Sequence, residues 1–367
     1  MDSDIFLEST ESTLFDMAND MIGEPKKKTK WERRQAMGND NTIPMHEQAS
    51  KSEQGGGTFS IERMPAKKHR HFEDARDASV VQWDGPTGIR LALHRYDQFN
   101  GQDWIQTAGP KTESLTRINL DGAPWFFDPM MRNSLNDSSD AISVGLLKVI
   151  RLDSKRLPVP MLTAGIHIKE VDRQDFFGIA EDGSFFMPGR EKVPPLTVVH
   201  VASVGLTEDQ IRATLRVDLT GDEKGDRKDL LHQYVSDWTK ELEAPYDKLQ
   251  TIVTHLRTEF VFDRGGQSAA TSLEEFLRSR RGGDHLFATS AALMAREIGL
   301  SSRLVTGFYV RPDSFDPMAG HASVLPQDVH VWAEVRLQDG RWFEIEPTPS
   351  YEQPQYQPSW RLLARRF

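Results

Sequence analysis

One strong helix pattern followed by three strand patterns constrains the fold of this chain more than any other feature. The helix pattern covers residues 284–298, and Gly299 stands where a glycine commonly ends a helix. Strand patterns follow at Ser302–Val310, His330–Leu337 and Trp342–Glu346. Asp339-Gly340 supplies a hairpin turn between the last two. A helix followed by an antiparallel sheet predicts an α+β arrangement.

Two further helix patterns precede this unit. Apolar residues recur at helical spacing after Pro245, at Leu249, Ile252, Val253, Leu256 and Phe260. Ser272 is placed to cap a second, short helix that has acidic residues in its first turn. We therefore expect an α+β core over residues 245–350, with a helix packed on an antiparallel sheet.

Three motifs within this core resemble those of the transglutaminase-like superfamily, whose fold is papain-like. They are Gly282-Gly283-Asp284-His285-Leu286-Phe287-Ala288, His330-Val331-Trp332-Ala333-Glu334 and Trp342-Phe343-Glu344-Ile345-Glu346-Pro347-Thr348. The resemblance is to the large membrane-anchored bacterial members in particular. Two positions depart from the family pattern. Asp284 stands where the nucleophilic cysteine belongs, and Glu346 stands where an aspartate belongs. The chain has 0 Cys.

The resemblance implies a thiol mechanism that this chain cannot perform. In such a triad the nucleophile lies at a helix N-terminus, the position of Asp284, where the helix dipole stabilises a thiolate. The residue at the His330 position accepts the proton, and the carboxylate at the Glu346 position orients the imidazole. A carboxylate that attacked an amide would form an anhydride while expelling a poor amine leaving group. We expect no ordinary thiol acyl transfer, and an Asp284–His330 ion pair instead.

Three interpretations of the altered site stay open. The first is a catalytically inactive module that keeps a cleft for a peptide or partner protein, with Trp332 and His285 as binding residues. The second is a hydrolase or amide-processing enzyme built on Asp284, His330 and Glu346, which are also ligand types that a metal accepts. No H-E-x-x-H motif supports a metal, and we expect no cofactor. The third is a purely structural extracytoplasmic domain.

The rest of the chain divides by composition. Residues 1–76 are polar and predict a flexible arm, with one short amphipathic helix at 12–22. Residues 77–240 carry short strand patterns separated by turn signals and predict a β-rich domain with a helical connection. Residues 351–367 form a C-terminal tail whose aromatic and basic end has the composition of a membrane boundary.

Charge and hydropathy limit the partners. The net charge is -10 and the pI about 5.6, which argues against a nucleic-acid binder. The chain contains no run of 18 apolar residues. We therefore expect membrane attachment only through anchors absent from this chain. The resemblance implies a location on the extracytoplasmic side of the bacterial cell membrane.

Overall fold

The computed structural model describes residues 58–60, 79–109, 114–131, 142–169, 171–217, 229–264 and 270–356. The predicted helix at 12–22 and the end of the tail from residue 357 lie outside the described residues. Most of the predicted arm at 1–76 lies outside them too, apart from a short strand, β1 (Thr58–Ser60).

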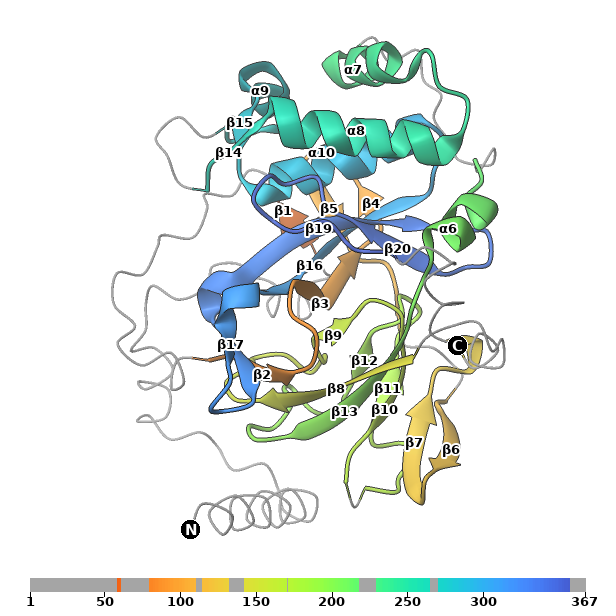
Figure 1. The fold of residues 1–367 in the computed structure, drawn as a ribbon, viewed down its shortest axis with the longest axis vertical. Helices are drawn as coiled ribbons and strands as arrows, with labels where there is room; N and C mark the ends of the chain where they lie inside the picture. Colours follow the sequence, from red (N-terminus) through yellow and green to blue (C-terminus); the bar gives the residue numbers. More distant parts are fainter. Residues whose placement is uncertain are drawn as a thin grey trace.

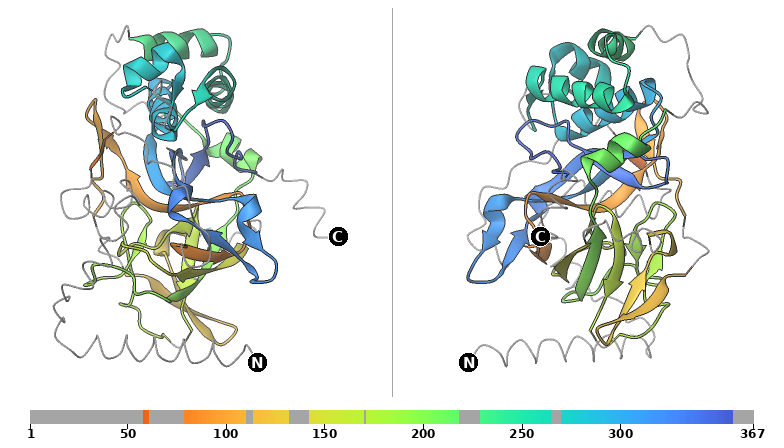
Figure 2. Two further views of the ribbon diagram at one scale, coloured as in Figure 1. Left: turned by 90° about the vertical axis from the view of Figure 1, so that its left-hand side faces the viewer. Right: turned by 45° about the vertical axis from the view of Figure 1, so that its right-hand side comes forward.

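Three layers make up the structure, with helices over a five-stranded sheet and a larger sheet beneath (Figures 1 and 2). The five-stranded sheet has the order β20 (Trp342–Ile345), β19 (Val329–Arg336), β16 (Ser302–Val310), β3 (Ile89–Tyr96) and β9 (Val159–Pro160). All its neighbouring strands are antiparallel. The β16, β19 and β20 strands agree with the predicted strands to within one residue.

The larger sheet has eight strands and forms the lower layer in Figure 1. Its order is β17 (Phe315–Asp316), β18 (His321–Val324), β2 (Val81–Asp84), β8 (Ile142–Val149), β13 (Val198–Val204), β10 (Thr163–His167), β7 (Ala123–Phe127) and β6 (Thr116–Leu120). Two separate two-stranded sheets consist of β11 (Gly178–Ile179) with β12 (Phe185–Phe186) and of β14 (Val261–Phe262) with β15 (Arg281–Gly282). A three-stranded sheet joins β1, β5 (Asp103–Ile105) and β4 (Gln98–Phe99).

The β-rich region at 77–240 and the predicted core at 245–350 each contribute strands to the sheet of the other. From the β-rich region, β3 and β9 enter the five-stranded sheet, where β3 pairs with β16. In return, β18 leaves the 245–350 region and pairs with β2 in the eight-stranded sheet. Because of this exchange, the face of the five-stranded sheet opposite the helices carries residues from both regions. The division of the chain into separate domains stays a prediction.

The helices cover one face of the five-stranded sheet (Figure 1). They are α6 (Glu208–Thr214), α7 (Leu230–Thr239), α8 (Pro245–Glu259), α9 (Leu273–Ser279) and α10 (Asp284–Glu297). The predicted cap of α9 is present, since Ser272 accepts a hydrogen bond from the Glu275 backbone. Gly299 follows α10 with a φ of 83°, the left-handed conformation expected after a helix. The predicted fold class is confirmed: α+β, with an N-terminal β-rich region.

The core between helices and sheet explains why α10 is central. The α10 residues Leu286, Phe287, Ala288, Ala291 and Ala292 are fully buried. They pack with the odd-numbered residues of β19, Val331, Ala333 and Val335, in one apolar cluster. The even-numbered residues of β19 therefore point to the opposite face of the sheet, because side chains alternate along a strand. Those even-numbered residues include His330.

Candidate functional site

Asp284 is the first residue of α10, as predicted, and Gly283 is the N-cap. No side chain caps α10. The carboxylate of Asp284 lies instead at the positive end of the helix dipole, where an anion is stabilised. Asp284 is only 2% exposed. A buried carboxylate needs compensating partners, because leaving one unpaired in the protein interior is costly.

His330 is one of those partners, and it lies between two carboxylates. Its Nδ1 lies 2.9 Å from Asp284 Oδ2, and its Nε2 lies 2.6 Å from Glu346 Oε2. The side chains of His330 and Glu346 have no exposed surface. The expected proximity of all three positions is thus present. Both ring nitrogens face an acceptor, and only the imidazolium form can donate from both.

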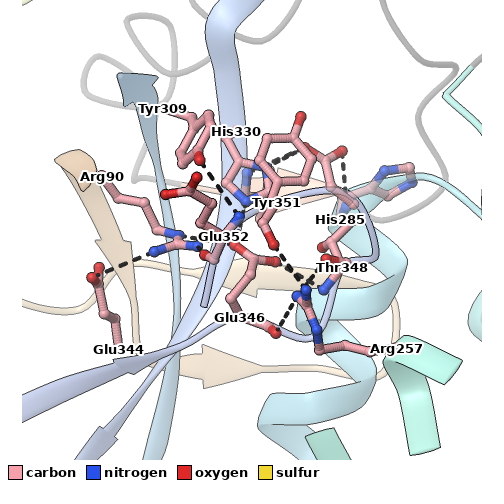
Figure 3. A network of polar contacts seen from close by, with 12 residues as sticks. Arg90, Arg257, His285, Tyr309, His330, Glu344, Glu346, Thr348, Tyr351 and Glu352 are labelled. Atoms are coloured by element: carbon pink, nitrogen blue, oxygen red, sulfur yellow. Dashed lines mark hydrogen bonds and ion pairs between the residues drawn. The ribbon is translucent and has the colours of Figure 1, made fainter. Parts of the chain in front are cut away.

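Two arginines that the motifs do not contain complete the cluster. Arg264 binds Asp284 and also donates to the Val329 carbonyl. On the other side, Arg90 Nε lies 2.8 Å from Glu346 Oε2, and this side chain is fully buried. Figure 3 shows Arg90 reaching from β3 toward Glu346 and Glu344. The groups alternate in charge as Arg264, Asp284, His330, Glu346 and Arg90, and all but the half-buried Arg264 are buried.

This alternation sets the protonation states. Burial lowers the pKa of His330, but Glu346 and Asp284 raise it more, so the net pKa lies above its ordinary value. For Asp284, burial raises the pKa, but Arg264 and His330 overcome that effect and the net pKa lies well below the usual range. Burial likewise opposes the effect of His330 and Arg90 on Glu346, whose pKa falls to about 2. The raised pKa of His330 and its two carboxylate neighbours both favour the imidazolium form.

Tyr351 covers the imidazole. Its ring stacks on His330 with a centroid separation of 3.8 Å and an interplanar angle of 13°, as Figure 3 shows. Arg257 holds this segment in place by donating to the carbonyls of Thr348 and Tyr351, at 2.7 and 2.9 Å. Arg90 donates to the Glu352 carbonyl as well. The start of the predicted tail is therefore a strap over the cluster.

Comparison with known proteins agrees with the geometry. The family model described as the transglutaminase-like superfamily matches residues 232–347. Residues 232–347 form a transglutaminase-like domain. Two solved structures of the periplasmic domain of TgpA from Pseudomonas aeruginosa, one of them bound to ethylmercury, share its fold at a TM-score of 0.50. They are 13% and 14% identical, and the match covers 79% of this chain and 94% and 92% of those chains. No curated protein matches the sequence.

The transglutaminase-like domain places the two residues expected to bind a partner beside the cluster. Trp332 is fully buried with Ala92 and Val305, and its ring centroid lies 5.9 Å from that of His330. His285 is 6% exposed, and its backbone N–H donates to Asp284 Oδ1 at 3.2 Å. Their binding roles stay predictions; in this structure both side chains are packed inside the domain.

The arrangement of the cluster also bears on the metal hypothesis. Asp284 and Glu346 lie at different nitrogens of the same imidazole. A metal needs ligand atoms that converge on one point, whereas these carboxylates are separated by the ring. Within the part of the chain that the structure describes, no group of three or more histidine, aspartate and glutamate side chains could hold a metal ion.

Sequence reasoning missed Arg90, Arg264, Tyr351 and Arg257. A signal for the arginines was available in principle, since two carboxylates and one imidazolium leave a net negative charge that the protein interior must balance. Nothing in the sequence indicates which arginines supply that balance. Among the described residues, no helix is long and apolar enough to cross a membrane.

Proposed function

We propose that this transglutaminase-like domain is catalytically inactive and that Asp284, His330 and Glu346 form a structural ionic cluster. The observation that carries the proposal is the engagement of both nitrogens of His330 by carboxylates. A general base needs a ring nitrogen that is unprotonated and can reach the nucleophile. An imidazolium fails the first condition, because its Nδ1 already carries the proton that it donates to Asp284.

The reaction fails at each of its other requirements too. The chain has no thiol. The carboxylate at the nucleophile position is held by Arg264. Substrate approach to His330 is blocked by the stacked ring of Tyr351. Two independent features therefore oppose acyl transfer, the residue at position 284 and the ring of Tyr351, and restoring a cysteine at position 284 leaves Tyr351 in place.

We further propose that the chain is the extracytoplasmic part of a membrane-anchored bacterial protein and that it binds a peptide or protein partner. Support comes from the TgpA domains that share its fold, which are periplasmic. The cleft for this role need not be at the cluster, which is closed.

An assay of amine incorporation into a glutamine donor tests the inactivity. We expect the wild-type protein to stay at background and to match His330→Ala in the same assay. Hydrolysis of peptide and ester substrates, measured with and without added zinc, extends the test to the hydrolase alternative. Turnover above background that is lost in His330→Ala would contradict the proposal.

A further inference from the structure

A cavity of about 810 Å³ borders the face of the five-stranded sheet opposite the helices. Its floor, defined here as Arg95, Arg303, Glu334 and Asp182, is held together by ion pairs and hydrogen bonds. Glu334 bonds both arginines, and Arg303 also donates to the Asp182 carbonyl. Asp182 pairs in turn with Arg156. The charged groups of the floor therefore satisfy one another, whereas ligand-type side chains with open nitrogens lie elsewhere, on the eight-stranded sheet.

His167 of β10 and His200 of β13 lie directly opposite each other on neighbouring strands of that sheet. Figure 1 shows the two strands side by side in the lower layer. Their neighbours Ile166, Val199 and Val201 are buried in the core shared with the five-stranded sheet. The two histidines therefore point to the outer face of the sheet, because side chains alternate along a strand. Both are half-buried there.

The two imidazoles are close enough to share one ion. Their ring centroids are 5.3 Å apart, and their planes are inclined at 32°. Two imidazoles that bind one ion at about 2.0–2.1 Å per nitrogen, with a tetrahedral angle between them, have ring centroids about 5 Å apart. The observed separation matches that value. Because neither side chain is fully buried, the rings have room to rotate and align their nitrogens.

His167 is already oriented as a metal ligand. Its Nδ1 lies 2.7 Å from the carbonyl oxygen of Pro124. A carbonyl can only accept, so Nδ1 carries the proton, and Nε2 of the neutral ring keeps its lone pair. Metal-binding histidines commonly donate their other N–H to a backbone carbonyl in this way, which fixes the tautomer and the direction of the ring.

His200 supplies the second nitrogen. Its ring contacts Trp125 and His167, and among the described residues it has no hydrogen-bond partner. Burial and then the neighbouring His167 lower the pKa of His200, which favours the neutral form that binds a metal. The Trp125 ring packs beside both histidines, with centroid separations of 5.5 Å from His167 and 6.5 Å from His200. The pair thus presents two imidazoles next to one indole.

We propose that His167 and His200 bind one divalent transition-metal ion, with water in its remaining coordination positions. Imidazole nitrogens suit copper, nickel and zinc, and Cu(II) has the highest affinity of these for a given nitrogen site. Calcium and magnesium prefer oxygen ligands and should not bind here. The site is independent of the proposed inactivity, because neither histidine belongs to the ionic cluster.

Copper(II) chloride alone is the probe, titrated into the full chain by calorimetry at neutral pH. The background carries His69→Gln and His71→Gln, because these two histidines are close in sequence and compete for copper. His167→Gln and His200→Gln should each weaken binding about tenfold or more, since the second ligand of a chelate acts at a high effective concentration. His255→Gln is the control, because the Nδ1 of His255 lies beside Glu259 and away from a second histidine. It should leave the affinity unchanged.

Tryptophan fluorescence locates the ion independently of the histidine variants. Cu(II) quenches an indole that lies beside it, so part of the quenching should disappear in Trp125→Phe while the affinity stays the same. An unchanged denaturation midpoint shows that each variant is folded. The proposal is overturned if the background protein binds no copper, if both histidine variants keep its affinity, or if Trp125→Phe is quenched as strongly as the background protein.

Discussion

Two buried charged networks lie on the same face of β19, and only one of them is closed. His330 belongs to the ionic cluster, and Glu334, four residues later on the same face, belongs to the cavity floor. Both combine arginines with carboxylates. In the cluster each charge has an opposite neighbour and a tyrosine ring covers the imidazole. The cavity floor, formed by Arg95 and Arg303 with Glu334 and Asp182, pairs two arginines with two carboxylates and borders a cavity of about 810 Å³.

The difference teaches which features separate a structural ionic network from a candidate binding site. Neither burial nor perturbed pKa values distinguish the two, since the pKa of Glu334 is also lowered: burial raises it, but Arg303 and Arg95 overcome that effect. Access distinguishes them, because Tyr351 covers His330 whereas the second network borders a cavity. The three triad positions, Asp284, His330 and Glu346, are in the closed network, whereas Glu334 and Trp342 of the same motifs border the cavity.

Removing Arg90 should have the largest effect. Arg90→Met leaves Glu346 buried without its arginine and also removes the contact with Glu344. Loss of one partner of a buried ion pair costs about 3–5 kcal/mol. Chemical denaturation should show this loss, whereas Arg117→Met at the exposed pair with Asp172 should change stability little. Equal small effects of both substitutions would mean that the cluster is not a structural element.

Releasing the strap should have a smaller effect. Arg257→Met removes the donors to the carbonyls of Thr348 and Tyr351, and hydrogen bonds to charged groups contribute about 1.5–3 kcal/mol. We expect a loss of that size together with faster proteolysis between residues 346 and 356. Arg278→Met, at an exposed helix pair with Glu274, is the control. Unchanged proteolysis would show that Arg257 does not hold the strap.

The cluster should make stability depend on pH. The pKa of His330 is raised in the folded state. Its contribution is therefore complete below the unfolded pKa of about 6.5 and is lost as pH rises through the folded pKa. The free energy of unfolding should fall by up to about 1.4 kcal/mol per pH unit between the unfolded and the folded pKa of His330. Asp284 and Glu346 have lowered pKa values, so their contribution is present above their unfolded values and is lost as pH falls through the folded ones.

His330→Gln should remove the slope above pH 6.5 or so. Glu344 needs its own control, because burial raises its pKa to about 7 despite Arg90. It binds more protons when folded, and so it lowers stability as pH rises from its unfolded value to about 7. Glu344→Gln should remove that lower part of the slope only. The raised pKa of His330 would be contradicted if, above pH 6.5 or so, the free energy of unfolding of the wild-type protein were as independent of pH as that of His330→Gln.

Restoring the family's residues should have the smallest effect. In Asp284→Cys with Glu346→Asp the thiol returns, yet Tyr351 still covers His330. We expect no amine incorporation above background from this double variant. Adding Tyr351→Ala to it should give the first measurable turnover. Activity in the double variant alone would show that the strap does not block the cluster.

The sequence predicted more of the ionic cluster than of the network beside the cavity. Motifs predicted α10, the three strands after it and the proximity of Asp284, His330 and Glu346, because those positions are fixed by local helix and hairpin geometry. Arg90 could not be predicted, since it enters through β3 from the β-rich region. The cavity floor combines β3, β16, β19 and the turn between β11 and β12. Its composition depends on strand exchange, which no local pattern records.

The protonation state of His330 is the most direct test of the central claim. Nitrogen-15 NMR of selectively labelled histidine, assigned with His330→Gln, reports whether each ring nitrogen carries a proton. At about pH 8, well above the ordinary pKa of about 6.5, we predict an imidazolium with protons on both Nδ1 and Nε2. A neutral ring with one unprotonated nitrogen at that pH would contradict the account, because His330 would then retain the base that acyl transfer requires.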